Sequence, residues 1–119
     1  MITEEDIKAF ADIKLPEEDK YSEWVEGKII TEGDTRLVEN TLGLVGEAGE
    51  VAEKVKKLLR DSSRLDKDDI VKELGDVVFY ATALANYFGS NLQTVLEVNV
   101  AKLDDRAQRG VIKGSGDNR

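Results

Sequence analysis

The sequence predicts an all-α protein, with a core of the four-helix-bundle type that is completed by association between copies of the chain. A single proline among 119 residues, Pro16, leaves long stretches without the strongest helix breaker. Ala, Leu, Glu and Lys, which all favour helix, dominate the middle of the chain. Apolar residues recur there with a period close to that of an α-helix. The length suits one modest domain.

The first 34 residues form an N-terminal helical segment in this interpretation. Thr3 can cap a first short helix. Pro16 suits the first turn of a second short helix, which carries Trp24. Gly33 and Asp34 then interrupt the chain. The remaining residues divide into a main helical domain at 35–110 and a glycine-rich, loose tail at 111–119.

A long helix is expected from about Thr35 to Arg60. Its apolar positions follow the helical period: Val38, Leu42, Val45, Ala48, Val51, Ala52, Val55 and Leu59. Three glycines at three-residue spacing, Gly43, Gly46 and Gly49, fall inside it, although each costs a helix up to about 1 kcal/mol relative to alanine. They favour either close approach of a backbone or bulky ligand, or simple tight helix packing.

Two further helices follow a polar connector at residues 61–69. Asp66 or Asp68 can cap the third helix, which runs to about Phe88. From residue 77 to 84 this helix is apolar on nearly every side, which requires more than one neighbour, so we infer a partner subunit. Ser90 followed by Gln93 is a capping-box signature for a fourth helix, from about residue 91 to 108.

Charge and composition exclude several functions. The formal net charge of −8 argues against nonspecific binding to nucleic acid or to an anionic membrane. Without cysteine or histidine, acid–base or metal chemistry must come from carboxylates, lysine or tyrosine. The N-terminus lacks a signal-peptide pattern, and no apolar run approaches the length of a membrane span, so a cytoplasmic protein is expected.

Two pairs of carboxylates, each spaced i, i+3, interrupt apolar helical sequence: Glu47 with Glu50, and Glu73 with Asp76. If the two helices pack antiparallel, the four side chains converge and repel one another unless a cation intervenes. Magnesium prefers such oxygen ligands and keeps sites for water and phosphate. The alternative is that these are solvated charges on amphipathic helices. Two pairs wedged into apolar sequence favour the metal site.

Other polar and aromatic residues are candidates for substrate binding. Asn99, Lys102, Arg106 and Arg109 follow one another at helical steps of three and four on the fourth helix. They suit phosphate, although cations near a helix C-terminus are also favoured by the helix dipole. Lys54 can pair with Glu50 or reach a phosphate. Trp24 can stack on a base or anchor its helix on the core, and Tyr80, one turn after Asp76, should line the same cavity.

The segments GLVGEAGEVAEKVKK and KELGDVVFYATALA, together with NVAKLDDRAQRG, resemble the MazG-like group of all-α nucleoside triphosphate pyrophosphohydrolases. The resemblance covers about residues 37–110. It implies a helical bundle completed as a homodimer or homotetramer, and hydrolysis of nucleoside triphosphates, often deoxy forms, to monophosphate and pyrophosphate. It also implies four Mg²⁺ ligands, with Mn²⁺ as a substitute: Glu47, Glu50, Glu73 and Asp76. Asn99 and Lys102 would lie near the phosphates, and Tyr80 near base or sugar.

The hypothesis is metal-assisted attack of water on the α-phosphorus. Glu50 or Glu47 would take the proton from water, and Lys54, Lys102 and Arg106 would hold the pyrophosphate. The chain departs from the family pattern at Gly46, where the first of two adjacent glutamates is expected. That departure puts catalytic rate and metal count in question more than metal binding. The rivals are phosphoribosyl-ATP pyrophosphohydrolase activity, a helical dimer that binds nucleotide or metal without turnover, and an interaction module with acidic helix faces.

Overall fold

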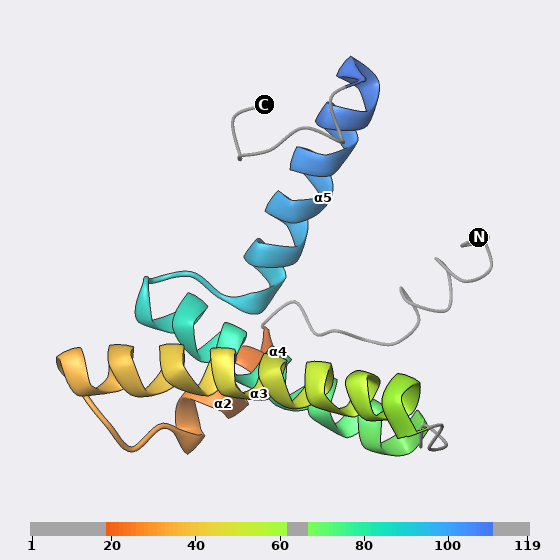
Figure 1. The fold of residues 1–119 in the computed structure, drawn as a ribbon. Helices are drawn as coiled ribbons and strands as arrows, with labels where there is room; N and C mark the ends of the chain where they lie inside the picture. The colour runs from red at the N-terminus through yellow and green to blue at the C-terminus, as the bar shows by residue number, and fades with distance from the viewer. Residues whose placement is uncertain (1–18, 62–66, 111–119) are drawn as a thin grey trace.

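The computed structural model describes residues 19–61 and 67–110, and every regular element in them is a helix (Figure 1). The four helices are α2 (Lys20–Lys28), α3 (Gly33–Asp61), α4 (Lys67–Tyr87) and α5 (Leu92–Arg109). The all-α prediction is therefore confirmed for these residues. The helix expected after Thr3, the expected cap Asp66 and the tail at 111–119 lie outside them.

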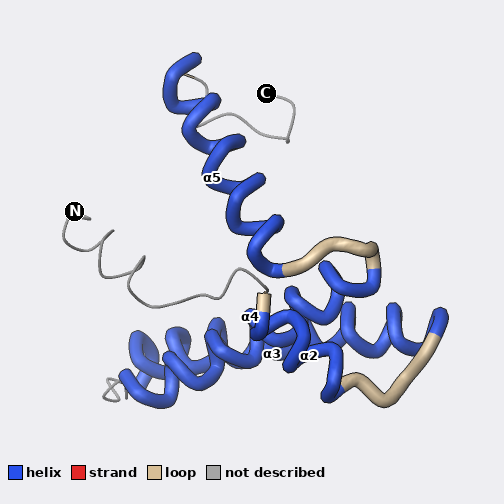
Figure 2. Tube along the Cα trace, turned by 180° about the vertical axis from the view of Figure 1, so that it is seen from behind, coloured by secondary structure: helices blue, strands red, loops and turns tan. Residues whose placement is uncertain are grey.

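The antiparallel pair of α3 and α4 is the body of the fold, and α2 packs against α4 (Figures 1 and 2). The α3–α4 register can be followed from two contacts. Arg36 lies over the ring of Tyr87, with 5.9 Å between Cζ and the ring centroid, and Gly43 lies against the side chain of Tyr80. One further turn along α3 leads to Glu47. In the same antiparallel register, Glu47 on α3 lies opposite Glu73 and Asp76 on α4.

α2 begins later than the sequence pattern predicts. Asp19 is its N-cap, with its side chain accepting a hydrogen bond from the backbone N–H of Ser22 at 3.0 Å. The helix that carries Trp24 therefore starts at Lys20, and the prediction of a first turn at Pro16 is wrong by four residues. An aspartate satisfies an otherwise free N–H group at this position, which proline cannot do with its ring.

The observed ends of α3 and α4 lie within two residues of the predicted ones. Gly33, which we expected to interrupt the chain, is the first residue of α3 and has a positive φ of 58°. Asp68 is not a cap, because it lies in the first turn of α4, where its charge suits the helix dipole.

The corner between α4 and α5 contains Gly89, whose φ of 77° lies in the left-handed region that favours glycine. Asn91, rather than Ser90, is the N-cap of α5, and its Oδ1 accepts from the N–H of Thr94 at 2.8 Å. The predicted capping box is therefore wrong by one residue. The side chain of Gln93 donates to Glu97 at 3.0 Å instead of turning back to the cap. From this corner α5 leads away from the α3–α4 pair (Figures 1 and 2).

The core of the described residues is small. Only Val25, Ala83 and Ala85 are buried apolar side chains among them. Residues 77–84, which we expected to be buried on nearly every side, are covered unevenly. Thr82 and Ala83 are fully buried, whereas Val78 is 41% exposed. Among the residues that the structure describes, no helix combines the length and apolar character needed to cross a membrane.

Candidate metal centre

Three carboxylates meet between α3 and α4: Glu47 from α3, and Glu73 and Asp76 from α4. Each offers one oxygen, and these oxygens all lie within 4.8 Å of one another. Glu73 and Asp76 share a face of α4 because they are one turn apart. The antiparallel register then brings Glu47 opposite them. We call these three residues the acidic cluster.

The electrostatics of the acidic cluster favour a cation. Partial burial, a hydrogen bond with Glu73 and the negative charges of Asp76, Glu73 and Glu50 all raise the pKa of Glu47 above its usual value. A carboxylate whose neighbours resist its ionisation is relieved by a positive charge placed between them. Hard divalent cations such as Mg²⁺ prefer oxygen donors of this kind. The donor set therefore fits such an ion.

Glu50 lies one turn beyond Glu47 on α3, and its side chain is exposed. It is not one of the three residues whose oxygens meet. Its charge nevertheless contributes to the raised pKa of Glu47, so it belongs to the same electrostatic neighbourhood. The structure thus brings together three of the four expected ligands, and ligation by Glu50 stays a prediction.

Lys54 stands at the margin of the acidic cluster. Its Nζ is 4.0 Å from Oε1 of Glu73, and both side chains are partly exposed. A pair this long contributes little to stability in contact with water. The lysine can therefore turn toward another anion that arrives beside the cluster.

Of the three glycines in α3, Gly43 is where α4 comes close. A Cβ at residue 43 would stand 2.6 Å from Cδ1 and Cζ of Tyr80, so any larger residue would require this ring to move. A Cβ at Gly46 or Gly49 would meet nothing within 4 Å. The close approach expected from the spacing thus occurs at one glycine, and its occupant is a side chain of the same chain.

Aromatic side chains continue from the acidic cluster onto α2. The ring centroid of Trp24 is 5.7 Å from that of Tyr21 and 5.9 Å from that of Phe79, which meets it edge to face. Phe79 in turn meets Tyr80 at 5.4 Å. Burial and the charge of Asp76 raise the pKa of Tyr21, which places this tyrosine near the cluster. Sequence reasoning did not select Tyr21, although its i, i+3 spacing from Trp24 was a usable signal.

The predicted phosphate-binding residues of α5 lie elsewhere. Asn99 and Lys102 line a cleft of about 340 Å³ that shares none of its described lining residues with the acidic cluster. Arg106 is buried, with 3% of its surface exposed. Arg109 forms an ion pair with Asp105 at 2.8 Å. Within one chain, α5 leads away from the helices that carry the carboxylates (Figure 1).

The fold and the cluster define a class: all-α proteins that gather carboxylates from two antiparallel helices, in an arrangement that could hold a metal ion. Within that class the chain belongs to the MazG family, because residues 37–111 match the MazG nucleotide pyrophosphohydrolase domain. The resemblance noted from the sequence is thereby confirmed. Membership of this family supports nucleotide pyrophosphohydrolase activity in general. Helix α2 lies before the matched residues.

The chain is also similar to a phage protein whose name states no function. The chain is 54% identical over 83 residues to the "Gene 37 protein" of Mycobacterium phage L5, which is 66% of this chain and 73% of the relative. No solved structure shows a significant match to this chain.

Proposed function

We propose that this protein hydrolyses nucleoside triphosphates, including deoxy forms, to nucleoside monophosphate and pyrophosphate in a Mg²⁺-dependent reaction. The convergence of Glu47, Glu73 and Asp76 inside the residues matched to the family carries this proposal. A triphosphate is highly anionic, and this chain carries a net charge of −8. The substrate therefore needs a cation between itself and the cluster.

A bound Mg²⁺ would supply neutralisation of phosphate charge and polarisation of the bond that breaks. Side chains of this protein bind the ion, accept the proton from water and bind the leaving pyrophosphate. Glu47, Glu73 and Asp76 hold the ion, while Glu50 or Glu47 takes the proton from the attacking water. Lys54, at the margin of the cluster, suits the departing pyrophosphate. Mn²⁺ offers the same preference for oxygen ligands as a substitute.

The aromatic side chains beside the cluster suit the nucleoside. Trp24 keeps 53% of its surface exposed while one edge packs on Phe79. Lys28 Nζ lies over the Trp24 ring, 5.7 Å from its centroid, and the exposed part of the indole can stack on a base. Tyr80 lies one turn beyond Asp76, and its ring meets that of Phe79. We assign base or sugar contacts to Trp24 and Tyr80.

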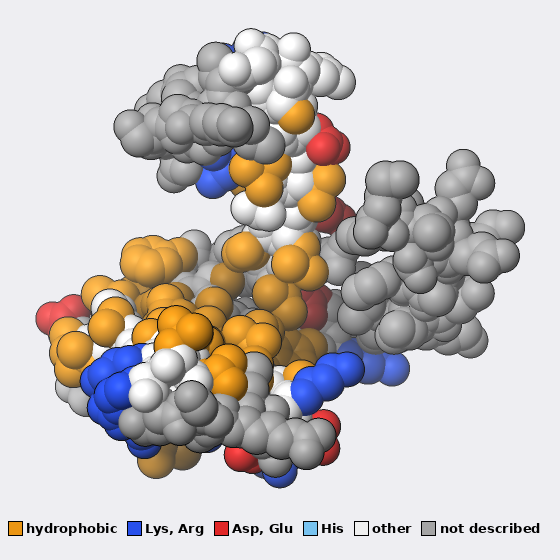
Figure 3. Space-filling model, turned by 45° about the vertical axis from the view of Figure 1, so that its right-hand side comes forward, with side chains coloured by type: hydrophobic (Ala, Val, Ile, Leu, Met, Phe, Trp, Pro, Cys, Tyr) orange, Lys and Arg blue, Asp and Glu red, His pale blue; other side chains and the backbone are white. Residues whose placement is uncertain are grey.

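A homodimer or homotetramer completes the bundle in this proposal. Large apolar side chains remain exposed on all four described helices. Monomeric soluble proteins rarely expose large contiguous apolar patches. Figure 3 shows hydrophobic side chains gathered on one side of the body and along α5. The exposed large apolar residues of α3, α4 and α5 include Val38, Leu42, Val45, Leu59, Val71, Leu74, Val95, Leu96, Val98 and Val100. In such an assembly, α5 of one copy can bring Asn99 and Lys102 to the acidic cluster of another, whereas the burial of Arg106 argues against its predicted contact with phosphate.

The decisive experiment is turnover with identified products. The purified protein is incubated with Mg²⁺ and a panel of canonical and modified triphosphates, and monophosphate and pyrophosphate are quantified. We expect Asp76→Asn and Glu47→Gln each to abolish turnover while the protein remains folded. Glu39→Gln, an exposed glutamate on the same helix α3, is the matched control and should retain activity. Full activity in both cluster variants would refute the assignment.

A non-catalytic nucleotide- or metal-binding role is the second candidate, and Gly46 is the observation that favours it. Gly46 occupies the position of a family glutamate, and the space around it is open. Gly46→Glu should therefore fold without steric conflict. Turnover that appears only in this variant would support the binding role for the natural chain. Pyrophosphate release by the natural chain from phosphoribosyl-ATP alone would instead identify that compound as the substrate.

A further inference from the structure

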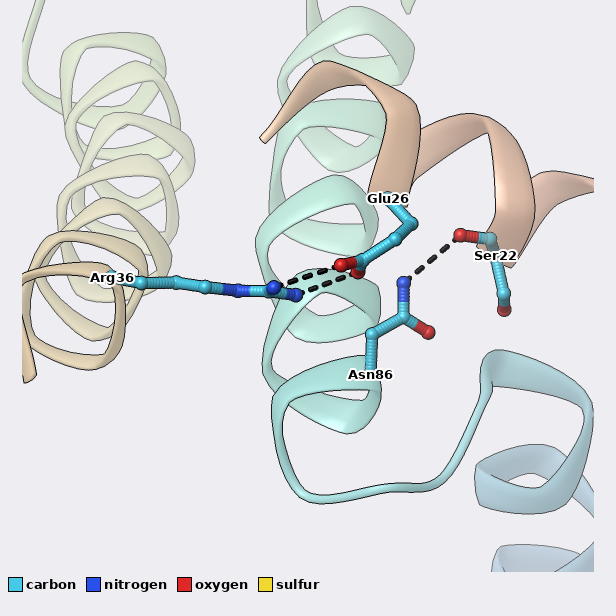
Figure 4. Close-up of polar contacts among 4 residues, drawn as sticks. All are labelled: Ser22, Glu26, Arg36 and Asn86. Carbon is cyan, nitrogen blue, oxygen red and sulfur yellow. Dashed lines mark hydrogen bonds and ion pairs between the residues drawn. The ribbon is translucent and has the colours of Figure 1, made fainter. Parts of the chain in front are cut away.

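Helix α2 holds both sides of the corner between α4 and α5 through one serine. Asn86, in the last turn of α4, donates from Nδ2 to the backbone carbonyl of Ser22 at 2.9 Å. Figure 4 shows the Asn86 side chain directed toward Ser22. Leu92, the first residue of α5, donates its backbone N–H to Oγ of the same Ser22 at 2.9 Å. Ser22 itself is buried, with 4% of its surface exposed.

The two carboxylate oxygens of Asp19 add further hydrogen bonds at this corner, and each accepts from different groups. Oδ1 caps α2 by accepting from the backbone N–H of Ser22. Oδ2 accepts from the Ser22 hydroxyl at 2.6 Å and from the backbone N–H of Gln93 at 2.7 Å. These hydrogen bonds outweigh the effect of burial and lower the pKa of Asp19, so the carboxylate is charged at neutral pH.

The first turn of α5 is thus capped largely from another helix. The first N–H groups of any α-helix have no partner within that helix. Here Asn91 satisfies the N–H of Thr94, whereas Ser22 and Asp19 satisfy those of Leu92 and Gln93. Side chains of α2 and its N-cap therefore fix the position of the start of α5, across 70 and 74 residues of sequence.

Of the side chains of α5, all of which lie in the described part of the chain, only Arg106 near the far end is buried, so most of the helix is loosely packed. The corner contains Gly89, whose backbone is permissive. Val95, Leu96, Val98 and Val100 are each more than 40% exposed, so α5 buries little apolar surface against the described helices. A helix of 18 residues spans about 27 Å, so a small rotation at the corner displaces its far end by several ångströms.

We propose that Asp19 and Ser22 are positioning residues that set the direction of α5, and through it the place where Asn99 and Lys102 meet the substrate. The effect on α5 follows from the hydrogen bonds alone, whereas the effect on substrate rests on the proposed pyrophosphohydrolase function. Both residues precede the part of the chain matched to the family, at 37–111. We call Asp19 and Ser22, with their hydrogen bonds to Leu92 and Gln93, the clamp.

The test measures the direction of α5 in the full-length chain. Because the sequence contains no cysteine, Ala52→Cys on α3 and Gln108→Cys near the end of α5 provide two exposed sites for spin labels. Labelled protein is mixed with excess unlabelled protein, so that only distances within one chain contribute. Ser22→Ala removes the acceptor for Leu92, and Asp19→Asn leaves one acceptor oxygen where two are used. The controls are Ser90→Ala and Glu23→Gln, since both residues line the same cleft as Asp19 and Ser22.

We expect a narrow distance distribution in the parent and in both controls, and a broader or shifted one in Ser22→Ala and Asp19→Asn. For the same variants, KM for the nucleotide should rise by up to about tenfold, the scale of one or two hydrogen bonds, with kcat less affected. Mg²⁺ binding without nucleotide should be unchanged, because the acidic cluster is not displaced. A merely structural role would lower thermal stability without separating KM from kcat.

Distances in Ser22→Ala and Asp19→Asn that equal those of the controls would overturn the proposal. Altered distances with an unchanged KM would overturn its substrate part. If Ser22→Ala fails to fold, Asp19→Asn decides, since its remaining oxygen can still cap α2. If no variant, including the parent, turns over nucleotide, the proposed function fails while the distances still decide whether the clamp directs α5.

Discussion

Gly43 of α3 lies against the ring of Tyr80 on α4 so closely that a Cβ at position 43 would stand 2.6 Å from two atoms of that ring. Alanine in a helix normally gains about 1 kcal/mol over glycine. Here the added methyl must displace a tyrosine, and overpacking costs about 1–3 kcal/mol. We expect Gly43→Ala to lower the free energy of unfolding by about 1 kcal/mol, measured by denaturant titration.

Gly49→Ala is the matched control for this prediction, because it makes the same change in the same helix where a Cβ meets nothing within 4 Å. It should raise the free energy of unfolding by up to about 1 kcal/mol. Equal effects at the two positions would show that the Tyr80 ring yields without cost.

Repulsion within the acidic cluster predicts an effect of Asp76→Asn that reverses with magnesium. Without metal the variant should be more thermally stable than the parent, because the charge of Asp76 is one cause of the raised pKa of Glu47. With Mg²⁺ at about 100 times its Kd, the parent gains about 2.7 kcal/mol, whereas the variant gains much less. Differential scanning calorimetry with and without Mg²⁺ measures both effects.

The same repulsion gives the metal-free protein a defined pH dependence. The folded-state pKa of Glu47 lies above 4.5, so the folded state binds more protons than the unfolded state between 4.5 and that raised value. Stability should therefore fall as pH rises through this window, and Mg²⁺ should remove the fall. Glu39→Gln should leave both behaviours unchanged, and a Glu39→Gln variant that abolished them would contradict the assignment to the cluster.

The ion pair between Glu26 and Arg36 has the opposite dependence on pH. Two hydrogen bonds from Arg36, at 2.8 and 2.6 Å, join α2 to α3 and lower the pKa of Glu26 below 4.5 (Figure 4). A lowered carboxylate pKa contributes stability that is present above the unfolded value and lost as pH falls through the folded value. Asp19 acts in the same direction. We expect unfolding free energy to decline below about pH 4.5.

Glu26→Gln should remove part of this acid-dependent decline and cost about 1 kcal/mol at neutral pH, a modest value because the Glu26 side chain is 48% exposed. Chemical denaturation at a series of pH values measures both quantities. Glu23→Gln changes an exposed glutamate of the same helix and should alter neither. A parent curve that is flat in acid would contradict the role of this pair.

Sequence patterns predicted the long helices well because their cause is local. The apolar period of α3 gave its extent to within two residues, since periodic burial and helix propensity act over many positions. Caps were less predictable. Ser90 and Asn91 are adjacent polar residues that can each cap a helix, and only the packed geometry selects Asn91.

In the candidate site too, features with a local cause were predictable from the sequence, whereas those that depend on packing were not. The spacing of Glu73 and Asp76 predicted a shared face, whereas antiparallel packing with the helix of Glu47 was only a condition of the hypothesis, which the structure meets. The direction of α5 did not follow from its sequence. The helical spacing of Asn99 and Lys102 shows that they share a face, but the contacts that aim this face come from Ser22, 70 residues before Leu92.

Trp24 provides the last prediction, because the sequence left open whether it stacks on a base or anchors the core. The structure shows an edge packed on Phe79 and 53% of the surface exposed, so one side chain can serve both roles. It is the single tryptophan of the chain, so its fluorescence reports on this position alone. We expect its emission to change when a nucleoside triphosphate binds with Mg²⁺.

Two substitutions separate the roles of Trp24. Trp24→Phe keeps an aromatic face, whereas Trp24→Leu keeps only apolar bulk. Stacking of a base on an aromatic side chain is worth about 1–3 kcal/mol, so Trp24→Leu should raise KM by about tenfold and Trp24→Phe by much less. Both should lower the unfolding free energy slightly through lost contact with Phe79. Equal stability losses with KM unchanged in both variants would leave Trp24 only its anchoring role, and the base-binding surface would then have to be sought on α5 of a second copy.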